Sequence, residues 1–279
     1  VGSEMCIRDS YITLQRAMAS GHRIFELLDI EIDIKDTENA KDISVKKGKI
    51  EFKNVDFEYN FNEPVLKKLN FTIEENETVG LVGPTGSGKT SIASLIHRFY
   101  EIKNGNIFID DQDIQKVTQS SLSDNISMVL QDPIIFSGTV EDNIKYKAKA
   151  TREEVIEASK IVGSHKFIMT LPNGYDTILE ESGANISVGQ RQLLSFARAL
   201  LLNTKIFILD EATSYIDSYT ERQIQNALDR VLENRTGIII AHRLSTIKNA
   251  DKIIVLNKGE IVEIGNHEKL LSNKNLYWK

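Results

Sequence analysis

The chain has 279 residues, a formal net charge of −6 and the apolar content of an ordinary globular protein. Without a basic excess it cannot neutralise nucleic-acid phosphates over a large surface, so the charge argues against a nucleic-acid partner. The one cysteine, Cys6, excludes an internal disulfide. No apolar run reaches the roughly 20 residues of a membrane-spanning helix. These features predict a soluble globular chain.

The beginning of the chain differs in pattern from the rest. Residues 1–10 fit no pattern that follows, and we interpret them as sequence foreign to the natural protein. Residues 11–48 are predicted to hold the end of a helix and a polar linker, and residues 49–279 the main domain. The helix is predicted because apolar residues recur at helical spacing on one face: Leu14, Met18, Phe25 and Leu28.

Strands and helices alternate through the main domain. Continuous β-branched or apolar runs, such as 205–209 and 237–241, are typical of parallel strands that are buried on both faces. The sequence therefore predicts an α/β fold with a mostly parallel sheet. Strands are predicted at 49–59, 65–73, 78–82, 105–109, 126–131, 205–209, 237–241 and, as a pair, 252–264. Helical spacing is found at 92–99, 153–162 and 190–202.

A glycine-rich segment lies between the predicted strand 78–82 and the predicted helix 92–99. Glycines let backbone N–H groups approach phosphate oxygens, and the helix adds its unpaired N-terminal donors. Lys89 is predicted to contact the β- and γ-phosphates and Thr90 to bind Mg²⁺. A chance glycine-rich turn is disfavoured because strand, loop and helix follow in order. The segment matches the pattern G-x-x-x-x-G-K-[ST] with Gly83, Pro84, Thr85, Gly86, Ser87, Gly88, Lys89 and Thr90.

Two carboxylates, Asp210 and Glu211, end the apolar run 206–209. Ligands of open α/β sheets bind at the carboxyl ends of the strands, so we expect both side chains to face the glycine-rich loop. We assign Asp210 to Mg²⁺ and Glu211 to the general base that polarises the attacking water. In isolation an acidic pair at this place more often caps the next helix. Beside a phosphate loop, the catalytic interpretation is favoured.

The segment Ile186-Ser187-Val188-Gly189-Gln190 stands at the start of a predicted helix. From about Lys49 to its end the chain resembles the nucleotide-binding domain of an ABC transporter, whose signature is usually Leu-Ser-Gly-Gly-Gln. The resemblance implies a P-loop NTPase core of the RecA-like type, an antiparallel β subdomain and an inserted α-helical subdomain at about 132–202. It also implies a head-to-tail dimer, in which Ser187, Gly189 and Gln190 face the ATP held by a second ABC domain.

Other positions match the family residue by residue. Tyr59 matches the aromatic residue that stacks on adenine, Gln131 the glutamine at the metal, and His242 the histidine at the γ-phosphate. Taken singly, Tyr59 and His242 would be read as a strand aromatic and a core histidine. Three more residues match positions near the signature and after the acidic pair: Glu181, Ser214 and Asp217.

The chain departs from the family pattern at two places. Val188 replaces the first glycine of the signature, and Tyr215-Ile216 replace the usual Ala-Leu after the acidic pair. Val188 keeps its backbone N–H group. The anion site is therefore predicted to persist, provided that the backbone of Val188 remains in an allowed region.

Residues 15–29 are similar to the segment of ABC exporters that leads from the last membrane helix into the ATPase domain, and residues 129–140 to bacterial multidrug-type exporters. The resemblance implies ATP and Mg²⁺ as cofactors and a fused or associated transmembrane domain. It also implies a place on the cytoplasmic face of the inner membrane. The transported substrate, and whether the dimer has identical halves, cannot be read from this sequence.

Three alternatives stand beside this interpretation. DNA-repair and chromosome-structuring ABC ATPases carry a long coiled coil between the phosphate loop and the signature, and the interval from Thr90 to Ser187 has no heptad run. ABC ATPases that act on ribosomes normally have two ATPase domains in one chain. A regulatory half that does not hydrolyse ATP is disfavoured by Glu211 and His242. The motor of an exporter is the preferred interpretation.

Overall fold

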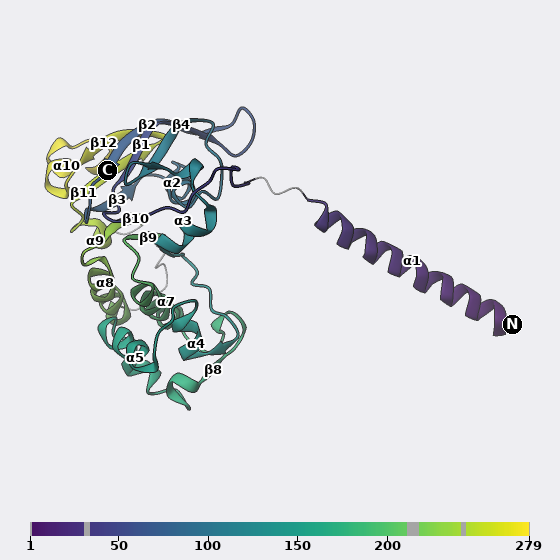
Figure 1. The fold of residues 1–279 in the computed structure, drawn as a ribbon. Coiled ribbons are helices and arrows are strands. Elements are labelled where there is room, and N and C mark those ends of the chain that lie inside the picture. The colour runs from purple at the N-terminus through teal and green to yellow at the C-terminus, as the bar shows by residue number, and fades with distance from the viewer. Residues whose placement is uncertain (1, 31–33, 211–217, 241–243, 279) are drawn as a thin grey trace. The chain divides into compact units, whose positions relative to one another are not determined.

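A computed structural model describes residues 2–30, 34–210, 218–240 and 244–278 (Figure 1). Its contacts divide the chain into two units, Val1–Lys35 and Asp36–Lys279. The first unit contains the predicted amphipathic helix, α1 (Gly2–Leu28), which also takes in residues 2–10. Among the described residues, no helix is both long and apolar enough to cross a membrane.

The second unit is built on a six-stranded sheet of order β12-β11-β3-β10-β9-β6. All neighbouring strands pair in parallel except β12, which is antiparallel to β11. The mostly parallel sheet confirms the predicted fold class. Its strands are β3 (Thr78–Val82), β6 (Ile126–Val129), β9 (Ile206–Asp210), β10 (Thr236–Ile240), β11 (Lys252–Asn257) and β12 (Glu260–Gly265).

Both faces of this sheet are buried, as its apolar runs predict. Successive side chains of a strand point to opposite faces, so Ile206 and Ile208 of β9 enter one hydrophobic core while Phe207 and Leu209 enter another. The first core is shared with an antiparallel sheet and a helix. The second core is shared with a group of helices. The sheet therefore forms the middle layer of the domain.

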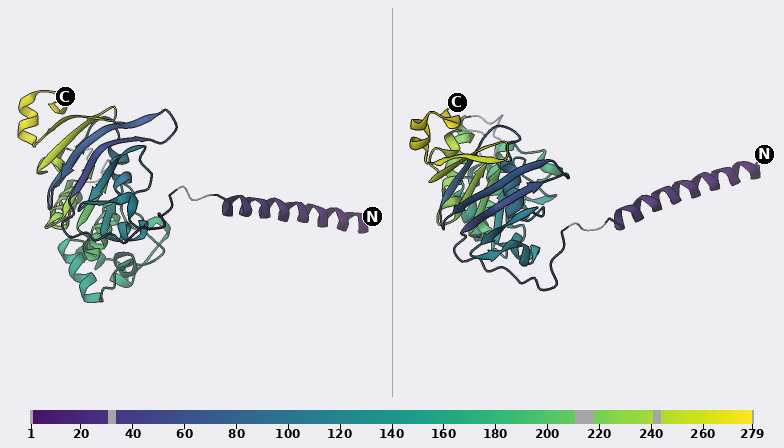
Figure 2. Two further views of the ribbon diagram at one scale, coloured as in Figure 1. Left: turned by 45° about the horizontal axis from the view of Figure 1, so that its top comes forward. Right: turned by 90° about the horizontal axis from the view of Figure 1, so that it is seen from above.

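The antiparallel sheet has the order β2-β1-β4-β5. Its strands and α2 (Lys89–Ile96) both contribute side chains to the first core. The predicted antiparallel β subdomain is thus present. In Figures 1 and 2 these strands and α10 (His267–Asn273) lie at the opposite end of the unit from α4 and α5. The bounds are β1 (Ile50–Glu58), β2 (Pro64–Ile73), β4 (Asn104–Ile109) and β5 (Gln112–Asp113), followed by η1 (Ile114–Lys116) and α3 (Gln119–Asn125).

The inserted helical subdomain lies between β6 and β9 in the sequence. Three of its helices begin at a capping box, in which the N-cap hydroxyl and the N3 side chain satisfy each other's backbone donors: Thr139 with Asp142, Thr151 with Glu154, and Ser187 with Gln190. Its elements are β7 (Gly138–Thr139), α4 (Val140–Lys145), α5 (Arg152–Ile161), α6 (His165–Ile168), η2 (Gly174–Asp176), β8 (Ile178–Leu179), η3 (Glu181–Gly183) and α7 (Val188–Leu202). The remaining elements are α8 (Ser218–Leu232), α9 (Leu244–Ile247) and η4 (Leu276–Trp278).

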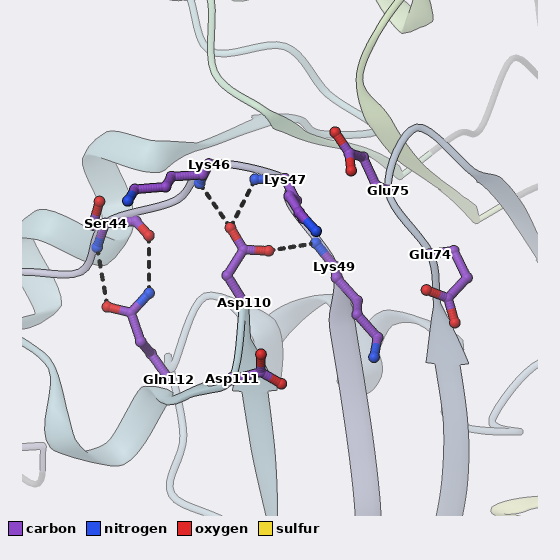
Figure 3. Close-up of a pocket in the computed structure, with 9 residues that line it drawn as sticks. All are labelled: Ser44, Lys46, Lys47, Lys49, Glu74, Glu75, Asp110, Asp111 and Gln112. Atoms are coloured by element: carbon purple, nitrogen blue, oxygen red, sulfur yellow. Dashed lines mark hydrogen bonds between the residues drawn. The ribbon is translucent and has the colours of Figure 1, made fainter.

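The polar segment 36–49, predicted as a linker, is fastened to the edge of the second unit. The carboxylate of Asp110 accepts hydrogen bonds from the backbone N–H groups of Lys46, Lys47 and Lys49, at 2.7, 2.8 and 2.9 Å (Figure 3). Burial alone would raise the pKa of Asp110, but these backbone donors together hold it below its ordinary value. The carboxylate therefore stabilises the folded linker in its ionised form.

Replacing Asp110 by Asn should lower the free energy of unfolding at pH 7 by about 1.5–3 kcal/mol, the usual range for hydrogen bonds to a charged group. Because the folded-state pKa lies below the ordinary 3.8, this contribution is complete above that value and is lost as the pH falls below it. Urea unfolding of the two proteins at a series of pH values measures the difference. The exposed neighbour Asp111 provides the control, and an equal loss in Asp111→Asn would contradict the assignment.

Candidate nucleotide-binding site

The phosphate loop connects β3 to α2, as predicted. Three of its glycines have positive φ values: 148° at Gly83, 79° at Gly86 and 101° at Gly88. Gly83 is also confined in space, because a Cβ atom there would lie 2.1 Å from the backbone oxygen of Leu256. Gly86 has open space around it. Glycine is thus required by conformation at three positions and by close packing at Gly83.

Lys89 lies inside the loop in this structure. Its Nζ atom donates hydrogen bonds to the backbone oxygens of Gly83 at 2.8 Å and Pro84 at 3.1 Å. Burial lowers the pKa of the Lys89 ammonium, and the negative charge of Asp210 opposes that shift. Ser87 is buried, and its hydroxyl has no hydrogen-bond partner in the described part of the chain. The loop thus holds a cation and a spare hydroxyl, both suited to an anionic ligand.

Asp210 is the last residue of β9, and strand register brings it to the edge where the phosphate loop begins. β10 pairs with β3 on one side and β9 on the other, and Ile240 is opposite both Leu81 and Asp210. The charge of Asp210 acts on Lys89, which agrees with this arrangement. Four predicted residues lie outside the described residues: Glu211, Ser214, Asp217 and His242.

Tyr59 is hydrogen-bonded to α2, the helix that follows the phosphate loop. Its hydroxyl and that of Ser91 in α2 are 2.9 Å apart and form a hydrogen bond. The ring packs edge-on against Phe57 and Tyr100, with centroids 4.7 and 4.9 Å away. Tyr59 nevertheless keeps 48 % of its surface exposed. The ring is therefore held in position beside the loop with part of its surface open to a ligand.

Two other predicted metal ligands are exposed. Thr90 is the second residue of α2, and Gln131 follows β6 by two residues. β6 pairs in parallel with β9, with Val129 opposite Leu209. Gln131 thus belongs to the same edge of the sheet as Asp210.

The signature residues lie at the N-terminus of α7. The Ser187 hydroxyl accepts a hydrogen bond from the N–H group of Gln190 at 3.2 Å, and the Gln190 side chain accepts one from the N–H group of Ser187 at 2.9 Å. Ser187 is exposed and Gly189 is buried. The hydroxyl proton of Ser187 remains available to a ligand, because the hydroxyl acts only as an acceptor in this capping box.

Val188, which departs from the family pattern, fits the helix. It is the first residue of α7 and is not among the residues with positive φ. The backbone condition stated from the sequence is therefore met. Arg191, one turn later, donates to the backbone oxygens of Gly183 and Ile186, which fixes the loop before the signature.

The structure gathers the predicted residues into two groups. Tyr59, the phosphate loop and Asp210 share the sheet edge and α2. The signature residues Ser187 and Gln190 bond each other, and within the described ranges neither bonds the phosphate loop.

Known proteins share both the sequence pattern and the fold. The pattern of the ABC transporter family matches residues 66–214, which is more than half of the chain. The chain belongs to the ABC transporter family. This ABC domain binds and hydrolyses ATP, as the family does to drive transport, so the ATPase prediction is confirmed at the level of the family.

Similar proteins extend this assignment. The chain is 46 % identical over 268 residues to an ATP-dependent lipid A-core flippase of Syntrophus aciditrophicus, which covers 96 % of the chain and 44 % of that protein. It is 48 % identical over 256 residues to a putative multidrug export ATP-binding/permease protein of Staphylococcus aureus, which covers 91 % of the chain and 44 % of that protein. The chain thus spans about half the length of these relatives.

A solved structure of a bacterial Atm1-family ABC exporter with ATP bound has the same fold. The TM-score is 0.87 at 40 % sequence identity, and the match covers 96 % of this chain and 47 % of that one. The P-loop fold predicted from the sequence is confirmed by this similarity.

Sequence reasoning missed two features of the ABC domain. Ser91, which directly follows Gly88-Lys89-Thr90, was not predicted, because no residue spacing indicates its contact with Tyr59. Ser87 was assigned to the loop by its place in the pattern, and the burial of its hydroxyl was not predicted. Both features depend on three-dimensional neighbours and carry no spacing signal.

Replacing Gly83 by Ala should weaken ATP binding about tenfold more than replacing Gly86 by Ala, since only the former adds a backbone clash of the size that costs 1–3 kcal/mol. Both glycines have positive φ, so the pair separates close packing from conformational strain. Titration of each purified variant with a fluorescent ATP analogue gives the two affinities. Equal affinities in folded variants would contradict the role of the Leu256 contact.

Proposed function

We propose that this chain is the ATP-driven motor domain of an ABC exporter, fused to or associated with a transmembrane domain. The observation that carries the proposal is similarity over nearly the whole chain to exporters about twice as long, one of them named as an ATP-binding/permease protein. The alternative, an ABC ATPase that acts on nucleic acid or ribosomes, is not favoured by these similarities or by the net charge of −6.

The residues at the sheet edge are proposed to bind ATP in one orientation. Tyr59 would stack on the adenine, because its ring is fixed by Ser91 and partly exposed. The backbone N–H groups of the phosphate loop and of α2 would surround the phosphates. Lys89 would exchange its bonds to the loop oxygens for bonds to the β- and γ-phosphates.

Mg²⁺ fits the oxygen donors of this edge. Thr90, Gln131 and Asp210 offer hydroxyl, amide and carboxylate oxygens, the hard ligands that Mg²⁺ prefers alongside water and phosphate oxygens. Bound there, the ion would neutralise phosphate charge during hydrolysis. We assign the general base to Glu211 and the γ-phosphate contact to His242, both from the family pattern.

A second copy of the domain is proposed to complete the site. Ser187 and the N–H groups at the start of α7 form an anion-binding N-terminus, yet they belong to a different subdomain from the phosphate loop. In the proposed head-to-tail dimer, this N-terminus meets the γ-phosphate on the partner. Each chain then supplies half of two composite sites, and ATP holds the dimer together.

An exposed apolar surface on the helical subdomain is proposed to contact the transmembrane domain. It is formed by Leu130, Ile134, Phe136 and Tyr146, of which Ile134 is 53 %, Phe136 45 % and Tyr146 54 % exposed. Aromatic and aliphatic side chains gathered on a surface are typical of an interaction site. Leu130 and Ile134 of this surface flank Gln131 in the sequence, so movement at the ATP site would reach it. From the family pattern, we propose that the domain lies at the cytoplasmic face of the membrane.

Replacing Glu211 by Gln should abolish turnover while leaving ATP binding intact, because the amide cannot accept the proton of the attacking water. ATP should then trap a dimer. Light scattering of the variant with and without Mg-ATP measures its mass, and a phosphate-release assay measures its turnover.

The control is Glu157→Gln, which changes an exposed carboxylate of α5. This variant should hydrolyse ATP and should not accumulate as a dimer. A Glu211→Gln protein that binds ATP and stays monomeric at all concentrations would contradict the proposed dimer.

A further inference from the structure

Arg198 of α7 contacts the segment 134–146, which includes α4. This segment follows the loop after β6 that carries the proposed metal ligand Gln131, here called the metal-site loop. Its Nε atom donates to the backbone oxygen of Asn143 at 2.8 Å, and one Nη atom donates to that of Ile134 at 3.1 Å. The guanidinium thus bonds two points of the segment that are nine residues apart in sequence.

Asn143 closes the same segment from within. It is buried, and its amide pairs with the backbone of Phe136 in both directions, at 2.8 Å to N and 2.9 Å to O. It also donates to the backbone oxygen of Thr139 at 3.0 Å. The segment is therefore closed on itself by Asn143 and is bonded at residues 134 and 143 to one side chain of α7.

Two aromatic rings complete the contact. Phe136 and Tyr146 stack with centroids 5.4 Å apart, and the Arg198 guanidinium lies 5.5 and 5.3 Å from them. These rings form part of the exposed apolar surface described above. A guanidinium can bond carbonyls at its edge and aromatic rings at its face at the same time, which an ammonium group cannot do.

Among the residues that the structure describes, no Asp or Glu forms an ion pair with Arg198. Burial lowers the pKa of its guanidinium, so the charge is kept at a cost and is balanced only by carbonyl oxygens and ring faces. The Arg198 guanidinium therefore links the segment 134–146 to α7.

The two elements joined by Arg198 adjoin different halves of the proposed ATPase site. The segment 134–146 follows Gln131, the proposed metal ligand, and α7 begins at Ser187, the proposed contact to the partner's γ-phosphate. We propose that Arg198 is a positioning residue that makes the segment 134–146 and α7 move as one body. The signature is thereby placed according to the state of the metal-site loop and the apolar surface. This inference rests on the proposed function for its consequence in turnover.

Arg198→Lys tests the inference, because lysine keeps the charge and loses the fork that bonds both carbonyls. Turnover per site should fall about tenfold while the KM for ATP changes little, since the nucleotide is bound mainly by Tyr59 and the phosphate loop, and a misplaced signature would chiefly impair hydrolysis. Hydrogen exchange should become faster at two places, the amides of 134–146 and those of 187–191. If Arg198 only stabilised the segment 134–146, exchange would become faster at the amides of 134–146 alone.

Arg235→Lys is the matched control. Arg235 is a buried arginine that donates to the backbone oxygens of Ala199 and Leu200, near the C-terminus of α7. It has no hydrogen bond to the segment 134–146 among the described residues. This variant should leave exchange at 187–191 and turnover close to the original values. Tyr146→Leu, which removes one ring and keeps the carbonyl bonds, should give a smaller effect than Arg198→Lys.

Faster exchange at 134–146 with unchanged exchange at 187–191 would overturn the inference, and so would equal effects from Arg235→Lys. The exchange experiment needs no dimer, so it decides the coupling even if ATP-driven dimerisation fails. In that case the proposed function would be wrong while the coupling of the two elements would stand or fall on exchange alone.

Discussion

The parallel pairing of β3, β10 and β9 is the constraint on which the site depends. Parallel strands bring their carboxyl ends to one edge, so residues far apart in sequence, the loop from Gly83 and the carboxylate of Asp210, meet without any direct bond between their strands. β10 holds them at a fixed separation. Burial of β9 and β10 on both faces makes this register costly to change, because a slip of one residue would exchange the contents of the two cores.

A second constraint follows from where the signature stands. Ser187 is used as the N-cap of α7, a helix that packs in the helical subdomain, while the phosphate loop belongs to the sheet. Capping consumes only the acceptor of the hydroxyl and leaves its proton for a ligand. The domain thus offers one proposed anion site at the start of α2 and another at the start of α7. In the proposed dimer, each nucleotide would bridge the α2 site of one domain and the α7 site of the other.

The sequence predicted those parts of the domain that depend on local pattern. The phosphate loop follows from glycine spacing, the buried strands from their apolar runs, and α7 from the helical spacing at 190–202. Contacts between distant residues could not be predicted: Asp110 holds Lys46 and Lys47 across more than sixty residues, and Arg198 meets Asn143 across 55. Such pairs have no periodicity and depend on tertiary packing. The roles of Glu211 and His242, which lie outside the described residues, remain predictions from the sequence.

In the proposed mechanism, one chain binds ATP and two chains together form the site that hydrolyses it. Mixing two inactive variants, Lys89→Ala and Ser187→Ala, tests this claim most directly, because a mixed head-to-tail dimer contains one site with an intact Lys89 and an intact Ser187. Phosphate release is measured for each variant alone and for the equimolar mixture. Our account predicts that the mixture regains activity well above the sum of the two variants. Activity equal to that sum, with both variants folded and able to associate, would contradict it.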